Sequence, residues 1–497
     1  MLSKQEKEKR QEAMVLIMDD IIPEDHLLKQ IDKHVDFDFI YGLVKDKYCL
    51  DNGRPSIDPV ILIKIQLIQC LFGIKSMRQT IKDIEVNIAY RWFLGLGIKE
   101  KVPHFSTVGK NYERRFKGTN LYEEIFSTVL ERCIETGKVD KSIIFIDSTH
   151  VKAAANNKKF KNEEVKKIAK YYEESLKEEI NKDREEHNKK PLKEKDDNND
   201  KETHNIKKST TDPESGWFHK GEHKNVFAYN VETACDKNGF VLGSTVHPGN
   251  EHDSTTFMSI YNKVKDADTK MIVVDSGYKT PAIAKTLIDD NIEPLFPYKR
   301  PMTKKGFMRK KEYVYDEELD IYICPGYKAL KYSTTDRNGY RIYKSNPKDC
   351  INCKNLEVCT NNKHKQKTII RHIWEDYIEQ TEDIRHTLGN KEIYAMRKET
   401  IERIFGTIKE HHGFRYTLMK GKAKMEMKSL ITFTCINMKK LVKILARNTS
   451  DIFDILIIPL KFTKYLFENK NWVIFIFFNP VCLRSDIGCI IRYFLYS

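Results

Sequence analysis

The first quarter of the chain has apolar residues at the spacing of helices. Its clearest run follows Asp58-Pro59, a pair typical of a helix start. The run consists of Val60, Ile61, Ile63, Ile65, Leu67, Ile68 and Leu71. Two shorter helices are predicted over residues 77–84 and 88–94, with Ser76 and Asn87 as their N-terminal caps. The segment from about 23 to 116 is therefore predicted to be helical.

A basic helix is predicted to begin at Ser106-Thr107. It carries Lys110, Arg114 and Arg115. Short helices joined by tight turns, with exposed Arg and Lys, suit a contact with DNA of the helix-turn-helix kind. An ordinary helical domain with a solvated basic face would give the same pattern, so both interpretations stay open.

From Ser142 onward the hydrophobic pattern is that of strands. An apolar strand over 143–146 ends at Asp147, and a second over 271–274 ends at Asp275. Between them, Asn238-Gly239 predicts the turn of a hairpin. The remaining elements are hairpin strands over 225–234 and 240–247, helices over 254–264, 281–289 and 391–411, and a short strand over 294–296. The order predicts an α/β fold in which an antiparallel meander is joined to parallel strands through helices.

Two segments interrupt this order. Residues 156–211 are rich in Lys, Glu, Asp and Asn, and predict a solvated helix over 163–186 followed by a flexible loop. The second segment, 299–372, opens with seven cations and no acid, including Lys304 and Lys305. Such a run is often merely solvated, but beside a catalytic core it favours contact with phosphate.

The charge of the chain indicates its kind of partner. In its 497 residues, 86 Lys and Arg stand against 72 Asp and Glu, so the net charge is +14. This excess predicts a polyanionic partner, with nucleic acid ahead of a membrane surface. No signal-peptide pattern is seen, and the longest apolar run, 472–478, is much shorter than the roughly 20 residues of a membrane-spanning helix. We therefore expect a cytoplasmic protein with no membrane partner.

Four of the eleven cysteines are close enough in sequence to suggest a common role. Cys324, Cys350, Cys353 and Cys359 include one Cys-x2-Cys pair, which is a familiar zinc half-site. The other spacings are not those of a standard zinc finger. A structural Zn²⁺, with His364 as a spare ligand, and a set of reduced core thiols therefore remain alternatives.

Three carboxylates are candidates for catalysis. Asp147 and Asp275 end apolar strands, where open α/β sheets place their ligand sites, although an Asp at a strand end is commonly a turn former. Glu402 and Lys409 are seven residues apart on a predicted helix, which puts both on one face. A carboxylate presented with cations, beside two strand-end carboxylates, suits phosphoryl transfer on DNA with Mg²⁺.

At these residues the chain resembles a known family. IIFIDSTHVKA around Asp147, MIVVDSGY around Asp275 and YAMRKETIERIFGTIKEHHGFRY around Glu402 resemble the three catalytic blocks of bacterial insertion-sequence DDE transposases. The N-terminal IIPEDHLLKQID, NGRPSIDPVILIK and YRWFLGL resemble the helical domain of the insertion sequence 1182 group. Many relatives have three residues between the Arg and the Glu of the last block, whereas four separate Arg397 from Glu402 here.

The resemblance implies an RNase H-like catalytic core and a DNA transposase, which binds the ends of a mobile element and carries out strand cleavage and strand transfer. Asp147 would contact two Mg²⁺ ions, which Mn²⁺ is expected to replace, and Asp275 and Glu402 would each complete one. Tyr394, Arg397 and Lys409 would contact DNA. The implied partners are the double-stranded DNA of element ends and target, and a second copy of the chain during synapsis, at the nucleoid.

These elements predict five parts. They are a helical DNA-binding domain (1–138), the first part of the core (139–298), a basic insertion with cysteines (299–372), the catalytic helix with the rest of the core (373–447) and an atypical tail (448–497). Two alternatives are a nuclease of the same fold that cuts without joining, and a degenerate copy that only binds DNA. The separate helical domain and the three retained carboxylates favour the transposase.

Weaker signals have common structural explanations. The polar stretch from His247 to Asp253 could line the active site, but a turn with Asp253 or Ser254 as a helix cap is the favoured interpretation. Trp217 and Trp374 could stack on an unpaired base, but burial is the commoner outcome for a tryptophan.

Overall fold

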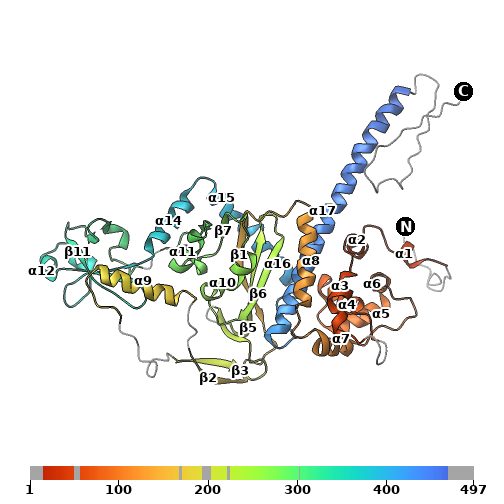
Figure 1. The fold of residues 1–497 in the computed structure, drawn as a ribbon, viewed down its shortest axis with the longest axis horizontal. Coiled ribbons are helices and arrows are strands. Elements are labelled where there is room, and N and C mark those ends of the chain that lie inside the picture. Colours follow the sequence, from red (N-terminus) through yellow and green to blue (C-terminus); the bar gives the residue numbers. More distant parts are fainter. Residues whose placement is uncertain are drawn as a thin grey trace, which may run out of the picture. The chain divides into compact units, whose positions relative to one another are not determined.

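A computed structural model describes residues 15–49, 56–166, 171–192, 203–220, 224–300 and 303–467 of the chain (Figure 1). Contacts within the chain divide it into two units, Met1–Val442 and Lys443–Ser497. The first unit contains all the candidate site residues. The apolar runs of the predicted tail, from 472 onward, lie outside the described residues.

The N-terminal part of the first unit is helical, as the hydrophobic spacing predicts. Its elements are α1 (Met18–Ile21), α2 (Leu27–His34), α3 (Phe39–Val44), η2 (Lys45–Lys47), α4 (Pro59–Leu71), α5 (Met77–Val86), α6 (Ile88–Phe93), α7 (Phe105–Asn111), η3 (Tyr112–Phe116) and α8 (Leu121–Glu135). The predicted caps are confirmed: Asp58, Ser76 and Asn87 each accept a hydrogen bond from the first turn of the following helix.

The predicted basic helix differs in two respects. It begins one residue earlier, because Nδ1 of His104 accepts a hydrogen bond from the backbone N–H of Ser106 and so acts as the cap. It also changes geometry, since Arg114 and Arg115 lie in the π-helical turn η3 rather than in α7.

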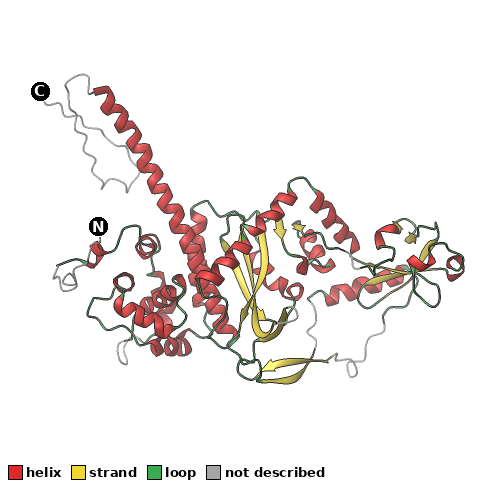
Figure 2. Ribbon diagram, turned by 180° about the vertical axis from the view of Figure 1, so that it is seen from behind, coloured by secondary structure: helices red, strands yellow, loops and turns green. Residues whose placement is uncertain are grey.

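The central sheet follows the predicted order of elements. Its strands are β1 (Ile143–Lys152), β4 (Gly216–Lys220), β5 (Lys224–Asp236), β6 (Val241–Pro248), β7 (Met271–Val273) and β8 (Glu293–Leu295). They lie in the order β6–β5–β1–β7–β8, with β4 paired to the beginning of β5. β1 pairs antiparallel with β5 and parallel with β7, and β7 pairs parallel with β8. Figure 2 shows the strands in yellow and the helices in red. The predicted meander joined to parallel strands is confirmed.

One face of this sheet is covered by α10 (Asp253–Val264), the short 3-10 helix η4 (Ser276–Tyr278) and α11 (Pro281–Asp289). Ile144 and Ile146 point to this face, where they pack with Phe257, Ile283 and Leu287 in the largest apolar cluster. Because strand residues alternate between faces, Asp147 points to the opposite face.

The long helix α17 (Lys422–Phe467) joins the sheet to the N-terminal helices. Asn437, on its first half, exchanges two hydrogen bonds of 2.9 Å with the backbone of Val241 in β6. On the other side, Nζ of Lys439 donates to the carbonyl of Leu71 at the end of α4, at 3.0 Å. The residues before Val442 therefore connect the helical part and the sheet within one unit.

The two insertions form structures that the sequence did not predict. Part of the first insertion makes a separate two-stranded ribbon of β2 (Phe160–Lys166) and β3 (Thr203–Ser209). In sequence, α9 (Glu173–Glu186) lies between these two strands. The second makes a five-stranded antiparallel sheet with short helices. Its elements are η5 (Lys310–Glu312), β9 (Val314–Asp316), β10 (Ile321–Ile323), β11 (Ala329–Thr335), β12 (Tyr340–Ser345), α12 (Pro347–Cys350), α13 (Leu356–Cys359) and β13 (Thr368–His372).

The prediction of a solvated helix over 163–186 is wrong. Its first residues are a strand, and α9 buries Leu176 and Ile180. The buried carboxylate of Asp183 also lies 2.6 Å from Nε of Arg341 in β12. The charged composition of this helix hid an apolar face, which packs against Ala282 of α11 and Trp374. The helix also contacts β11 of the second insertion.

Three helical pieces follow the second insertion: α14 (Glu375–His386), α15 (Asn390–Ala395) and the 3-10 helix η6 (Met396–Lys398). The helix that carries the third candidate carboxylate, α16 (Ile401–His411), comes next. The single helix predicted over 391–411 is therefore wrong. Thr400 has φ −104° and ψ −99°, which no helix accepts, and the chain changes direction there.

Candidate active site

Asp147 and Asp275 lie next to each other at one end of the parallel strands. The last paired residues of β1 and β7 are Phe145 and Val273. Asp147 and Asp275 each follow these paired residues by two positions. Both therefore lie equally far beyond the last pair of β1 and β7. Adjacent strands are about 4.8 Å apart, and the tertiary structure thus brings together two carboxylates 128 residues apart in sequence.

Both oxygens of Asp147 have partners. Oδ1 accepts a hydrogen bond from the backbone N–H of Ser148 at 2.8 Å. Oδ2 lies 2.6 Å from Nη2 of Arg397 in η6. Burial raises the pKa of Asp147 to about 6; the Arg397 guanidinium lowers it, and the nearby carboxylates of Asp275 and Asp253 raise it. This aspartate is therefore a desolvated carboxyl with a cationic partner, a condition common at functional sites.

Glu402 joins this group from the first turn of α16. The helix packs against β1, and Glu402 itself is exposed. The link to the other two carboxylates is seen at Tyr394 in α15. Burial raises the pKa of its phenol, Arg397 lowers it, and Asp275, Asp147 and Glu402 each raise it. All three carboxylates thus act electrostatically on the phenol of Tyr394.

The donor set suits hard divalent cations, because Mg²⁺ prefers carboxylate oxygens. The described part of the chain contains no group of three or more His, Cys, Asp or Glu side chains already arranged to hold an ion. At Asp147 the reason is visible, since Arg397 takes up one of its oxygens. The residues therefore fit such cations by type and location, and a cation would replace or share the contact of Arg397.

The residues predicted to contact DNA lie at several separate places in the structure. Lys110 and Arg114 are exposed, whereas the guanidinium carbon of Arg115 lies 4.4 Å from the ring centre of Tyr48. Lys304 and Lys305 are exposed ahead of the second insertion's sheet. Lys409 lies on α16, two turns after Glu402, as its spacing predicts. Arg397 is buried and contacts Asp147 instead of facing solvent.

The four cysteines of the second insertion lie around its sheet. Cys324 and Cys359 pack against the apolar cluster there, and Sγ of Cys359 is hydrogen-bonded to Oη of Tyr313 at 3.0 Å. Sγ of Cys350 lies 3.2 Å from Oγ of Ser345. No three of them are grouped as metal ligands in the part of the chain described, so zinc stays a prediction from the spacing.

The tryptophans have structural roles. Trp374 is 2% exposed, and its indole N–H donates to Glu179 of α9. Trp217 is half-buried, with its ring centre 4.9 Å from that of Phe227. For Trp374, the interpretation as a buried residue is confirmed.

Sequence reasoning missed two polar residues behind Asp147, Asn230 and Glu232, and assigned a third, Asp253, a different role. The cap of α10 is His252, not Asp253 or Ser254, so the favoured interpretation of that stretch is wrong in detail. Asp253 instead contacts Ser148 and Asn230. Glu232 is completely buried two residues after Asn230 in β5. Two polar residues at alternate positions of the apolar strand VFAYNVETAC are a signal that could have found them.

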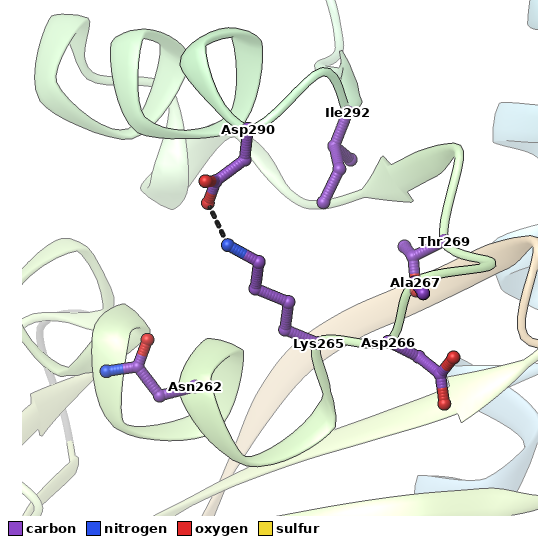
Figure 3. Close-up of a pocket in the computed structure, with 7 residues that line it drawn as sticks. All are labelled: Asn262, Lys265, Asp266, Ala267, Thr269, Asp290 and Ile292. Atoms are coloured by element: carbon purple, nitrogen blue, oxygen red, sulfur yellow. Dashed lines mark ion pairs between the residues drawn. The ribbon is translucent and has the colours of Figure 1, made fainter.

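A pocket of the core lies away from these carboxylates (Figure 3). It is lined by Asn262, Lys265, Asp266, Ala267, Thr269, Asp290 and Ile292. Lys265 reaches across it to Asp290 in an ion pair of 2.7 Å. Thr269 precedes β7, whereas Asp275 follows that strand, so the pocket opens at the opposite end of the sheet from the candidate active site.

Comparison with known proteins identifies the class. A family model described as Transposase domain matches residues 16–114, the N-terminal helices. A second, described as Transposase DDE domain, matches residues 323–442, which include Glu402, Arg397 and the four cysteines. The chain is therefore a DNA transposase of the DDE type, an enzyme that cleaves and transfers DNA strands. More particularly, its two domains are those of an insertion-sequence transposase.

Solved transposase structures show only distant likeness. The piggyBac transposase in a synaptic complex with hairpin DNA is 9% identical, with a TM-score of 0.31 over 86% of this chain and 74% of that one. The Mos1 transposase in a paired-end complex with a left transposon end is 10% identical, with a TM-score of 0.15 over 50% of this chain and 62% of that one. Neither likeness is close enough to establish a shared fold. No curated protein matches the chain.

Proposed function

We propose that the central sheet is an RNase H-like core in which Asp147, Asp275 and Glu402 hold the divalent cations of the transposase. The register of β1 and β7 is the observation that carries this assignment, because it places the two aspartates side by side. The packing of α16 on β1 supports Glu402 as the third member. The N-terminal motifs support membership of the insertion sequence 1182 group.

Two Mg²⁺ ions, or Mn²⁺ in their place, would activate a water or a 3′-hydroxyl and stabilise the leaving oxygen when bound. Asp147 would contact both ions, and Asp275 and Glu402 would each contact one. Arg397 lowers the pKa of Asp147. It therefore favours the ionised carboxylate, the form that binds a cation.

The basic residues on other elements would bind the DNA. Lys110, Arg114 and Arg115 on the N-terminal helices would bind the element ends. Lys304, Lys305 and Lys409 would contact phosphates near the carboxylates, and Tyr394 would complete the DNA surface. Synapsis of two ends would need a second copy of the chain, in the cytoplasm at the nucleoid. No helix in the described residues has the length and apolar character needed to span a membrane.

Strand cleavage by the full-length protein tests the assignment. Asp147→Ala, Asp275→Ala and Glu402→Ala should each reduce Mg²⁺-dependent cleavage of a labelled element end at least about 100-fold. End binding in a gel-shift assay should change little, because each variant loses a metal ligand but no phosphate contact. Glu410→Ala is the matched control, since Glu410 is an exposed carboxylate on the same helix that pairs with Arg415. Near wild-type cleavage by one of the three variants would remove that residue from the site.

The same assay separates the two kinds of enzyme. A transposase yields products in which the cleaved 3′ end is joined to target DNA. Cleavage without any joined product, under conditions where ends are paired, would indicate a nuclease with the same core.

A further inference from the structure

Asp253 lies directly behind the first catalytic aspartate. It is the first residue of α10, and its Oδ1 accepts a hydrogen bond of 2.8 Å from Oγ of Ser148. The backbone N–H of the same Ser148 donates to Oδ1 of Asp147. Ser148 thus connects the carboxylates of Asp253 and Asp147 through its two hydrogen bonds. A displacement of Asp253 would therefore move Ser148 and, with it, Asp147.

The same carboxylate also approaches the segment that carries the second catalytic aspartate. Gly277 lies two residues after Asp275, in the turn η4. A Cβ atom added at Gly277 would stand 3.4 Å from Oδ2 of Asp253. The two oxygens of Asp253 therefore face the two segments that end in Asp147 and Asp275, one oxygen toward each.

Asn230 in β5 supports this carboxylate from inside the protein. It is fully buried, and its Nδ2 donates to Oδ1 of Asp253 at 2.8 Å. Its own Oδ1 is buried and has no hydrogen-bond partner among the described residues. An unsatisfied buried acceptor is destabilising, and such groups call for an explanation in a native structure. The hydrogen bond to Asp253 explains the unpaired oxygen of Asn230, because the amide must turn its N–H toward the carboxylate to make that bond.

We propose that Asp253 is a positioning residue of the transposase site, which holds the segments of Asp147 and Asp275 at the separation that a divalent cation requires. The proposal rests on the assignment of those two aspartates as cation ligands. Its physical basis is that hydrogen bonds to a charged acceptor are about twice as strong as neutral ones, so a carboxylate fixes Ser148 and Asn230 better than a neutral group would. Asp253 acts through these neighbours and touches no reacting atom itself.

Binding of Mn²⁺ to the full-length protein, measured by isothermal titration calorimetry without DNA, tests the proposal independently of activity. Asp253→Ala should weaken Mn²⁺ binding at least about tenfold. Asp253→Asn keeps an oxygen acceptor for Ser148 but loses the charge, and it should have a smaller effect. Thr255→Ala is the control, because Thr255 is exposed on the same turn and should leave binding unchanged.

Thermal unfolding of each variant separates positioning from folding. The expected result is weakened Mn²⁺ binding at a temperature well below the unfolding midpoint, together with a higher Mg²⁺ requirement for cleavage. Unchanged Mn²⁺ affinity in Asp253→Ala, with or without a lower midpoint, would overturn the proposal. Asp147→Ala shows which inference fails: if it too leaves Mn²⁺ binding unchanged, the cation site itself is misassigned, whereas a loss confined to Asp147→Ala rejects only the role of Asp253.

Discussion

Nη2 of Arg397 lies 2.6 Å from Oδ2 of Asp147, although 250 residues separate the two in sequence. Only about 5% of the arginine side chain and 18% of the aspartate side chain are exposed. The pair explains how a carboxylate can stay ionised while desolvated within β1, just beyond the last residue that pairs with β7. It also changes the role expected of Arg397, from a contact with DNA to the counter-charge of the buried carboxylate of Asp147.

The stability losses from removing the two partners of this pair should not be additive. Arg397→Gln should lower the free energy of unfolding by about 3 kcal/mol, because it leaves a largely buried carboxylate without its cation. The double variant Asp147→Asn with Arg397→Gln should lose less than the sum of the two single variants. Urea unfolding at pH 7.5 measures the four proteins, and Arg397→Lys, which keeps the charge, is the control. Strictly additive losses would show that the two side chains are not coupled.

Glu232 predicts a pH dependence of stability. Burial raises its pKa to about 8, against hydrogen bonds from Thr256 and Tyr278 that lower it. The folded state therefore holds a proton that the unfolded state has released between about pH 4.5 and 8. This group makes the protein less stable as the pH rises through that interval, by up to about 1.4 kcal/mol per pH unit.

Glu232→Gln removes this titration while keeping the size of the side chain. The variant should gain stability relative to the natural protein as the pH is raised from 6 to 8, as measured by urea unfolding at both pH values. Glu251→Gln is the control. Glu251 is a less buried carboxylate that lies 3.5 Å from His247, and the same histidine lies 3.7 Å from Glu232. A constant difference between variant and natural protein across this range would mean that Glu232 is already ionised at pH 6.

The exposed cations of the N-terminal helices should contribute to DNA binding through phosphate contacts. Lys110→Ala with Arg114→Ala should weaken binding of full-length protein to an element end and lower the slope of log K against log salt by about 2. Arg132→Ala is a suitable control, because Arg132 is an exposed cation of α8 that pairs with Glu135. An unchanged salt slope, measured by fluorescence anisotropy, would exclude these two residues from the phosphate contacts.

The cysteine spacing predicts about one equivalent of zinc per chain. A Cβ placed on Gly326 would lie 3.6 Å from Sγ of Cys324 and 3.8 Å from Sγ of Cys353, so both thiols face one turn. Cys350→Ser with Cys353→Ser should release the metal, and elemental analysis of fresh protein measures it. Protein free of zinc, with all four thiols alkylated in the native state, would support the alternative of reduced thiols. Cys133→Ser, a buried cysteine of α8, is the control.

Local sequence patterns were enough to predict most elements of the core and their order. The caps Asp58 and Ser76, the hairpin at Asn238-Gly239 and the apolar strands before Asp147 and Asp275 all follow from signals within a few residues of each other. The prediction that the first strand ends at Asp147 is wrong, because β1 continues to Lys152 through its pairing with β5. Helix caps, turns and strand periodicity are local effects, because they arise from hydrogen bonds and side-chain spacing along one segment. The positions of the candidate carboxylates could therefore be predicted without the fold.

Which of these residues contact one another depends on the fold as a whole. The contact of Arg397 with Asp147, the approach of Asp253 to Ser148 and the packing of α9 against the second insertion join residues about 105 to 250 positions apart. No local pattern encodes such partners, since each depends on how strands pair and helices pack over the whole core. The break at Thr400 has the same origin, because the turn it makes lets η6 deliver Arg397 to Asp147 while α16 keeps Glu402 and Lys409 on a helix of their own.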